Sequence, residues 1–195
     1  MEVFKMISNR IQDHLHTVQL VNNSEQIISS IYSVSNLIIK TFQKGNKVYF
    51  CGNGGSAADA QHLAAEFSGR FYIDRVGLPA EALHCNTSYL TAVANDYSYE
   101  VIYSRLMTGM GRKGDVLVGI STSGNSKNII NAFEVCRNKG INTVAFVGHD
   151  GGIMGKIADY SLIIPSNDTP RIQELHILLG HIVCEIVETE LFKNK

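Results

Sequence analysis

The stretch KVYFCGNGGSAADAQHLAAEFS (residues 47–68) decides the fold of this chain. Its apolar opening, residues 47–51, predicts a buried β-strand, and residues 56–68 have the apolar spacing of a helix. The glycines between them permit a tight turn and leave backbone N–H groups pointing outward at the positive end of the helix dipole. Such a turn is an anion site, and we call residues 51–56 the first cradle.

The same order of strand, small-residue loop and helix returns later in the chain. A strand is predicted at residues 115–120 and a helix at 126–138, with STSGNS (residues 121–126), the second cradle, between them. Its hydroxyl groups can donate hydrogen bonds to phosphate oxygens. Patterns typical of dinucleotide or nucleoside triphosphate sites are absent, so a phosphate monoester fits better. A glycine turn and a serine N-cap without a ligand would explain either loop alone, but two at matching strand ends favour a ligand.

The remaining strands and helices complete an α/β pattern. Apolar strands are predicted at residues 142–147 and 160–164 and a weaker one at 79–84, while residues 1–44 and 170–192 are predicted to be helical. Short apolar strands that alternate with helices indicate a parallel sheet covered on both faces. We therefore predict a three-layer α/β sandwich with a central parallel sheet and additional N- and C-terminal helices.

Composition excludes several classes of protein. The net charge is -1 without a long run of either sign, which argues against a nucleic-acid partner. No apolar stretch approaches the roughly 20 residues that span a bilayer, and no secretory signal is visible. The four cysteines are scattered without a CxxC pair, as is typical of reduced cytosolic proteins. We expect a cytoplasmic protein with one domain (residues 1–195), in which residues 1–44 form a helical extension that packs on the core or on a neighbouring subunit.

A histidine and a carboxylate stand one turn apart after the first cradle. His62 and Glu66 are four residues apart, so both lie on one face of the predicted helix. Such a pair is usually a solvated ion pair, but beside a phosphate cradle it can be half of a metal site or an acid–base pair. On the last helix, Gln173 and His181 are eight residues apart, about 12 Å of rise. One ion cannot readily bind both from the same helix, so a kink or a second subunit must supply one of them.

These motifs carry a resemblance to a known family. Residues 114–126 resemble the phosphosugar-binding loop of the SIS (sugar isomerase) domain family. Within that family, residues 51–62, the pair Asn95-Asp96 and residues 171–176 are similar to those of the phosphoheptose isomerases, and the resemblance covers essentially the whole chain. It implies a flavodoxin-like fold, a phosphorylated seven-carbon sugar as substrate, one zinc ion per active site, and a homotetramer with active sites at subunit interfaces and no nucleic-acid or membrane partner.

The resemblance also implies a reaction and a set of site residues. The reaction is conversion of sedoheptulose 7-phosphate to D-glycero-D-manno-heptose 7-phosphate through an enediol, the first step of ADP- or GDP-heptose synthesis for lipopolysaccharide or capsule. Glu66 is the expected base and His181 the expected acid. The residues that match zinc ligands are His62, Glu66, Gln173 and His181. The expected substrate contacts are Asn53, Gly54, Gly55, Glu66, Asn95, Asp96, Ser121, Thr122, Ser123, Ser126 and Gln173. His176 matches no functional position, which favours a packing or interface role.

Two alternatives stay open at this point. A non-catalytic SIS adaptor that binds the bacterial replication-initiator protein has the same length and fold, although it has no need to keep all four residues that match zinc ligands. A different phosphosugar, such as an arabinose or hexose phosphate, would use the same cradles. The sequence also leaves open whether zinc is essential or only organises the site.

Overall fold

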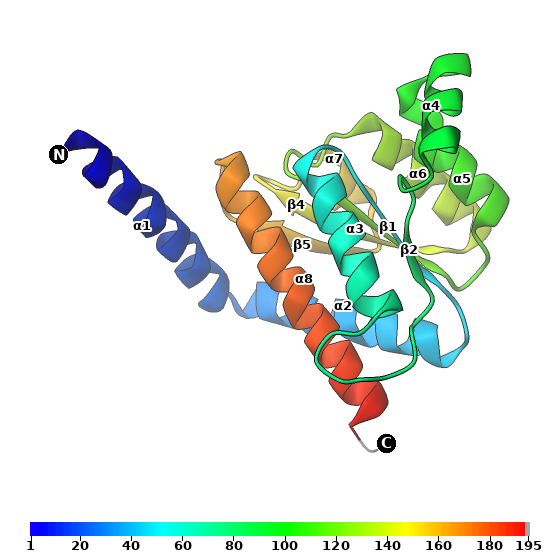
Figure 1. Ribbon diagram of the computed structural model, residues 1–195, viewed down its shortest axis with the longest axis horizontal. Helices are drawn as coiled ribbons and strands as arrows, with labels where there is room; N and C mark the ends of the chain where they lie inside the picture. The colour runs from blue at the N-terminus through cyan, green and yellow to red at the C-terminus, as the bar shows by residue number, and fades with distance from the viewer. Residues whose placement is uncertain (194–195) are drawn as a thin grey trace.

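Five parallel strands form a single sheet in the order β2-β1-β3-β4-β5 (Figure 1). The computed structural model describes residues 1–193, so residues 194 and 195 of the predicted domain lie outside the described part. The strands are β1 (Val48–Gly52), β2 (Ala80–Ala82), β3 (Val116–Ser121), β4 (Asn142–Gly148) and β5 (Tyr160–Ile164). The prediction of a central parallel sheet is confirmed, and the strand order is that of flavodoxin-like sheets.

Both faces of the sheet are buried. On β3, Val116, Val118 and Ile120 pack into one core cluster, whereas Leu117 packs into the other. Side chains alternate between the faces of a strand, so burial on both sides requires apolar residues at every position. This is the physical reason for the continuous apolar runs in the sequence.

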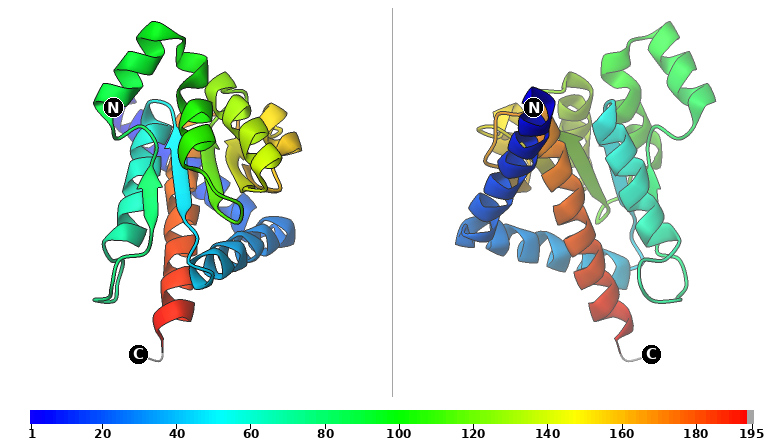
Figure 2. Two further views of the ribbon diagram at one scale, coloured as in Figure 1. Left: turned by 90° about the vertical axis from the view of Figure 1, so that its right-hand side faces the viewer. Right: turned by 60° about the vertical axis from the view of Figure 1, so that its left-hand side comes forward.

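Helices cover each face, and the predicted three-layer sandwich is confirmed. The helices are α1 (Glu2–Asn22), α2 (Glu25–Gln43), α3 (Gly55–Ser68), α4 (Thr87–Asp96), η1 (Tyr99–Val101), α5 (Ile102–Met110), α6 (Lys127–Lys139), α7 (Gly152–Ile157) and α8 (Thr169–Phe192). The first core cluster holds residues of α2, α3 and α8, and the second holds residues of α4, α5, α6 and α7. Figure 2 shows α3 and α8 side by side.

The two N-terminal helices differ in burial. Helix α2 buries an apolar face that includes Ile31, Val34 and Ile38 against the sheet. Helix α1 projects from the body of the molecule (Figure 1) and leaves large side chains such as Phe4 and Ile11 exposed. None of the helices within residues 1–193 has the length and apolar character that a membrane span requires.

The topology brings the two cradles together. The first follows β1 and the second follows β3, and these strands are hydrogen-bonded neighbours. The chain leaves them toward opposite faces, because α3 joins the first core cluster and α6 joins the second. In parallel α/β sheets, ligands bind in the crevice at the carboxyl ends of the strands, at this switch point.

Candidate active site

The first cradle requires glycine at three positions, one for its backbone conformation and two for close packing. Gly54 has φ 56°, a conformation that side chains with a Cβ rarely adopt. At Gly52, a Cβ would lie 2.3 Å from the carbonyl oxygen of Ser56, so the first turn of α3 folds directly over the strand end. At Gly55, it would lie 2.4 Å from Nε2 of Gln173. The amide of Gln173, on α8, therefore packs on the start of α3.

The second cradle gathers its hydroxyl groups. Ser121 Oγ lies 2.8 Å from Ser126 Oγ and 3.5 Å from Ser123 Oγ. Gly124 has φ 65°, and a Cβ there would lie 2.2 Å from a backbone oxygen of the loop after β4. The end of β4 and the start of α7 donate backbone hydrogen bonds to the cradle, from Gly148 N–H to the carbonyl of Thr122 and from Met154 N–H to the carbonyl of Gly124. The hydroxyl groups of the second cradle thus lie close together at the N-terminus of α6, in a loop whose backbone is fixed by its neighbours.

Two amides join the cradles. Asn53 Nδ2 donates to Asn128 Oδ1 at 3.1 Å, and Asn128 Nδ2 donates back to Asn53 Oδ1 at 2.8 Å. Tyr99 donates its hydroxyl proton to the same Asn53 oxygen at 2.9 Å. Behind the loop, the buried Tyr103 hydroxyl donates to the carbonyl of Gly52 at 2.5 Å. Asn53, predicted to contact substrate, is therefore held in one orientation from the first turn of α6 and from η1.

Three predicted residues form a cluster on α3 and α8. His62 Nε2 lies 3.1 Å from Glu66 Oε1 and 2.9 Å from His181 Nε2. One ligand atom from each of the three lies within 4.8 Å of the others. The His62 side chain is 49% exposed and that of Glu66 is 20% exposed, so the cluster has an open side. The prediction that His62 and Glu66 share a helix face agrees with this arrangement, and His181 joins them from the neighbouring helix.

A glycine allows the two helices to approach closely beside this cluster. At Gly180, a Cβ would lie 2.6 Å from both methyl carbons of Leu63, which is 1% exposed. Gly180 and Leu63 directly adjoin His181 and His62 in the sequence. The close approach of backbone and side chain at this point is what brings the two imidazole rings to a centroid distance of 5.1 Å.

Gln173 and His181 lie at different levels of the same helix pair. Gln173 packs on Gly55 at the first turn of α3, and His181 meets His62 seven residues further along α3. Helices α3 and α8 therefore run in the same direction, and their contacts advance by nearly the same number of residues along each helix. The separation that the sequence predicted for Gln173 and His181 is present in the fold.

The other predicted substrate contacts lie on α4. Asn95 and Asp96 are exposed at its C-terminal end, and Asn95 Nδ2 donates to Asp96 Oδ1 at 3.0 Å. Helix α4 follows β2, so it stands on the carboxyl side of the sheet, as the cradles do. Their role as substrate contacts remains a prediction.

Sequence reasoning did not single out Asn128, Tyr99 or Phe71. Asn128 is 3% exposed, and the sequence predicts it only as a residue of the helix at 126–138. The ring of Phe71 lies 5.7 Å from the ring of His181 and forms one wall of the cluster. A polar residue in the first turn of α6, next to a serine-rich loop, was the only available signal for Asn128.

His176 takes no part in the cluster. Its ring is fully buried at 6.1 Å from the ring of Phe146. Within residues 1–193, neither ring nitrogen has a hydrogen-bond partner. Burial lowers the pKa of His176 to about 4, so the ring is neutral in the folded protein at neutral pH. These features agree with the predicted packing role.

Comparison with known proteins connects this geometry to an activity. The sequence model of the SIS domain family matches residues 15–148. A phosphoheptose isomerase from Sulfurimonas denitrificans is 52% identical over 188 residues, covering 96% of each chain. Another, from Aneurinibacillus thermoaerophilus, is 49% identical over 189 residues, covering 97% of this chain and 96% of the relative.

Solved structures of phosphoheptose isomerases have the same fold as this chain. The phosphoheptose isomerase from Neisseria gonorrhoeae superposes with a TM-score of 0.90 at 36% identity, covering 96% of this chain and 99% of that one. The enzyme from Francisella tularensis gives a TM-score of 0.92 at 29% identity, covering 97% of this chain and all of that one. The chain therefore belongs to the SIS domain family and, within it, to the phosphoheptose isomerases, a group of aldose–ketose isomerases that act on sugar phosphates.

Proposed function

We propose that the chain converts sedoheptulose 7-phosphate to D-glycero-D-manno-heptose 7-phosphate, the first step of ADP- or GDP-heptose synthesis for lipopolysaccharide or capsule. The observation that carries the proposal is the cluster of His62, Glu66 and His181, of which the first two lie on the helix that begins at the first cradle. A phosphate on the cradles fixes one end of the sugar, and the cluster supplies proton-transfer groups for the other. Free cysteines throughout the chain support a cytoplasmic location.

The reaction moves one proton between adjacent carbons. Glu66 takes a proton from C1 of the open-chain ketose while His181 gives a proton to the C2 carbonyl oxygen, which leaves a cis-enediol. Return of a proton to C2, with loss of the C1 hydroxyl proton, gives the aldose. The two groups lie on different helices with their polar ends converging, as acid and base on one substrate require.

The phosphate end is held by the second cradle. Ser121, Ser123 and Ser126 present hydroxyl groups, and Thr122 adds a further one. We propose that Asn53, Gly54 and Gly55 of the first cradle contact the sugar chain, since Asn53 is oriented toward the second cradle by Asn128. Asn95 and Asp96 are proposed to contact hydroxyl groups from α4.

The cluster fits one zinc ion. Two imidazole nitrogens and one carboxylate oxygen are ligands that zinc accepts, and tetrahedral bonds of about 2.0–2.1 Å place ligand atoms roughly 3.3 Å apart. The corresponding distances here are 2.9 and 3.1 Å. A bound zinc ion would polarise a substrate oxygen as a Lewis acid. Coordination would also draw charge from Glu66 and weaken it as a base. Turnover before and after removal of the metal therefore tests whether zinc takes part in the reaction or only organises the site.

Gln173 is the remaining member of the predicted ligand set. In its own chain its amide packs on Gly55, two turns before His181 on α8. We propose that a second copy of the chain supplies it, in a homotetramer with active sites at subunit interfaces. The exposed apolar side chains of α1, such as Phe4, Ile7 and Ile11, support a role for residues 1–44 in packing between subunits.

The first experiment measures turnover of several ketose phosphates by the purified protein, before and after chelation. We expect the seven-carbon substrate to be preferred and Glu66→Gln to lose about 10²–10⁴-fold in kcat. Glu185→Gln, at an exposed position on α8, is the matched control and should retain activity. An active Glu66→Gln enzyme would remove Glu66 from its role as base, and preference for another ketose would overturn the substrate.

The shared site is tested by mixing two inactive variants. If Glu66 and Gln173 of one site come from different subunits, random reassembly of Glu66→Gln with Gln173→Ala restores about a quarter of the sites. Light scattering measures the number of subunits in parallel. A mixture that stays inactive while the subunits demonstrably exchange would contradict the shared site.

A further inference from the structure

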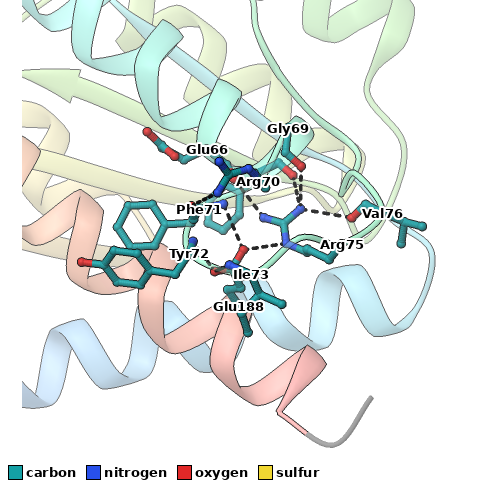
Figure 3. A network of polar contacts seen from close by, with 10 residues as sticks. Glu66, Gly69, Arg70, Phe71, Tyr72, Ile73, Arg75, Val76 and Glu188 are labelled. Atoms are coloured by element: carbon teal, nitrogen blue, oxygen red, sulfur yellow. Dashed lines mark hydrogen bonds and ion pairs between the residues drawn. The ribbon is translucent and has the colours of Figure 1, made fainter.

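A buried ion pair lies just beyond the cluster, between the C-terminal end of α3 and helix α8. Arg75 Nε donates to Glu188 Oε1 at 2.8 Å, and each side chain is only 2% exposed. Burying two charges costs free energy unless their other polar atoms are also satisfied. Here backbone groups of the last turn of α3 and of the segment that follows it satisfy them (Figure 3).

Arg75 caps the end of α3. Its Nη2 donates to the carbonyl of Glu66 at 2.9 Å, and its Nη1 donates to the carbonyls of Phe67 at 2.8 Å and Gly69 at 3.1 Å. The last carbonyls of a helix have no partner inside it, and a cation there also favours the helix dipole. The guanidinium therefore fixes the backbone of Glu66, the proposed base, through its main-chain carbonyl.

Glu188 holds the loop that follows. Its two oxygens accept hydrogen bonds from the successive N–H groups of Phe71, Tyr72 and Ile73 at 3.0, 2.6 and 2.9 Å. Consecutive N–H groups that point inward form an anion site, and this one is filled by the chain's own carboxylate. Burial alone would raise the pKa of Glu188, but the three N–H groups and Arg75 together hold it below its ordinary value, so the side chain is ionised.

Both ends of this network reach the cluster. Glu188 follows His181 by seven residues on α8, two turns along the same face. Phe71, whose N–H group Glu188 binds, places its ring 5.7 Å from the ring of His181. The network thus connects three parts of the site: the backbone of Glu66, the ring of Phe71 beside His181, and helix α8, which carries His181.

We propose that Arg75 and Glu188 are positioning residues for the isomerase site, which set the distance between Glu66 on α3 and His181 on α8. This inference rests on the proposed function, because it assigns those two residues the acid and base roles. A displacement of about 1 Å between catalytic groups can cost about 10²-fold in rate. The network acts on the backbone and on the ring wall, so it should affect kcat rather than substrate affinity.

The test compares Glu188→Gln with a buried carboxylate far from the site. Asp115 is 3% exposed and likewise accepts backbone N–H bonds, from Lys47 and Arg112, at the opposite end of the sheet. Asp115→Asn should therefore lower the melting temperature as Glu188→Gln does, without moving the cluster. Arg75→Lys keeps the charge but loses the five-donor fork, and it provides a milder variant in case Glu188→Gln does not fold.

Two readouts separate positioning from simple stability. We expect Glu188→Gln and Arg75→Lys to lower kcat about 10- to 100-fold with KM within about 3-fold of the parent enzyme. Solid-state NMR of ¹⁵N-histidine-labelled protein should show shifted ring signals of His62 and His181 in these variants and unchanged signals in Asp115→Asn. The NMR readout requires no turnover.

The outcomes are distinct. If the parent enzyme converts no ketose phosphate, the proposed function fails, and the ring signals still report whether the network positions the cluster. If the parent is active, but the folded variants lose only thermal stability and keep both kcat and the histidine signals, the network is purely structural and the inference is overturned.

Discussion

Protonation of the buried His176 should make the fold sensitive to acid. Its ordinary pKa of 6.5 falls to about 4 in the folded protein because the ring is buried. The unfolded chain therefore binds a proton that the folded chain does not take up, so stability is complete above pH 6.5 and falls as the pH drops toward 4. This difference between the two pKa values lowers the free energy of unfolding by roughly 3 kcal/mol at pH 4 and by about 2 kcal/mol at pH 5.

The assay is urea unfolding between pH 7.5 and 4.5 at one fixed protein concentration, because subunit association also affects apparent stability. His176→Leu replaces the titrating ring with an apolar side chain of similar size. We expect its stability to change less with pH than that of the parent protein by about 2 kcal/mol between pH 7.5 and 5. His16→Gln, at an exposed position of α1, should keep the parental slope. Equal slopes for the parent and His176→Leu would refute the reasoning.

Three further predictions concern glycine and amide contacts. Gly180→Ala should lower kcat and the melting temperature, since overpacking against Leu63 costs about 1–3 kcal/mol. Its control is Gly109→Ala, at a position with open space on α5, which should be neutral or stabilising by up to about 1 kcal/mol. Equal effects of the two substitutions on the melting temperature would contradict this prediction. Asn128→Leu should raise KM by about 10-fold by releasing the amide of Asn53, and an unchanged KM in steady-state kinetics would exclude that role. Gly124→Ala should destabilise by at least about 1 kcal/mol in urea unfolding, because φ is positive and its Cβ would strike backbone; wild-type stability would contradict it.

The sheet could be predicted because its signals are local. Strands that are buried on both faces must be apolar along their buried length, and residues 116–120 show this directly. Helix α4 gave no such signal, because it contains β-branched residues and buries only Val93. Its start was available in the sequence as Asn86, whose side chain accepts the N–H of Tyr89 at 3.0 Å. Local polar cues therefore matter most where apolar periodicity is weak.

The candidate site was predictable where its residues share one element. His62 and Glu66 are one turn apart on α3, so helix geometry alone places them together. The hydrogen bonds of Glu188 to residues 71–73 join positions more than 100 residues apart, and nothing in the local sequence of α8 specifies them. The same holds for the amide pair of Asn53 and Asn128, which exists only because β1 and β3 are neighbours.

The parallel course of α3 and α8 explains why one helix pair can serve two parts of the proposed reaction. Their first turns meet where Gln173 packs on Gly55, next to the first cradle, and their middle turns meet at His62 and His181. Seven residues of α3 separate these levels, about 10 Å along the helix. If α8 ran antiparallel with His181 still at His62, Gln173 would lie near the C-terminal end of α3, so the parallel arrangement is what places Gln173 beside the first cradle. We expect a change at Gly180 or at the Arg75–Glu188 pair to act mainly near His62 and His181, because Gly180 packs against Leu63 and Glu188 lies beyond His181 on α8, away from the first cradle.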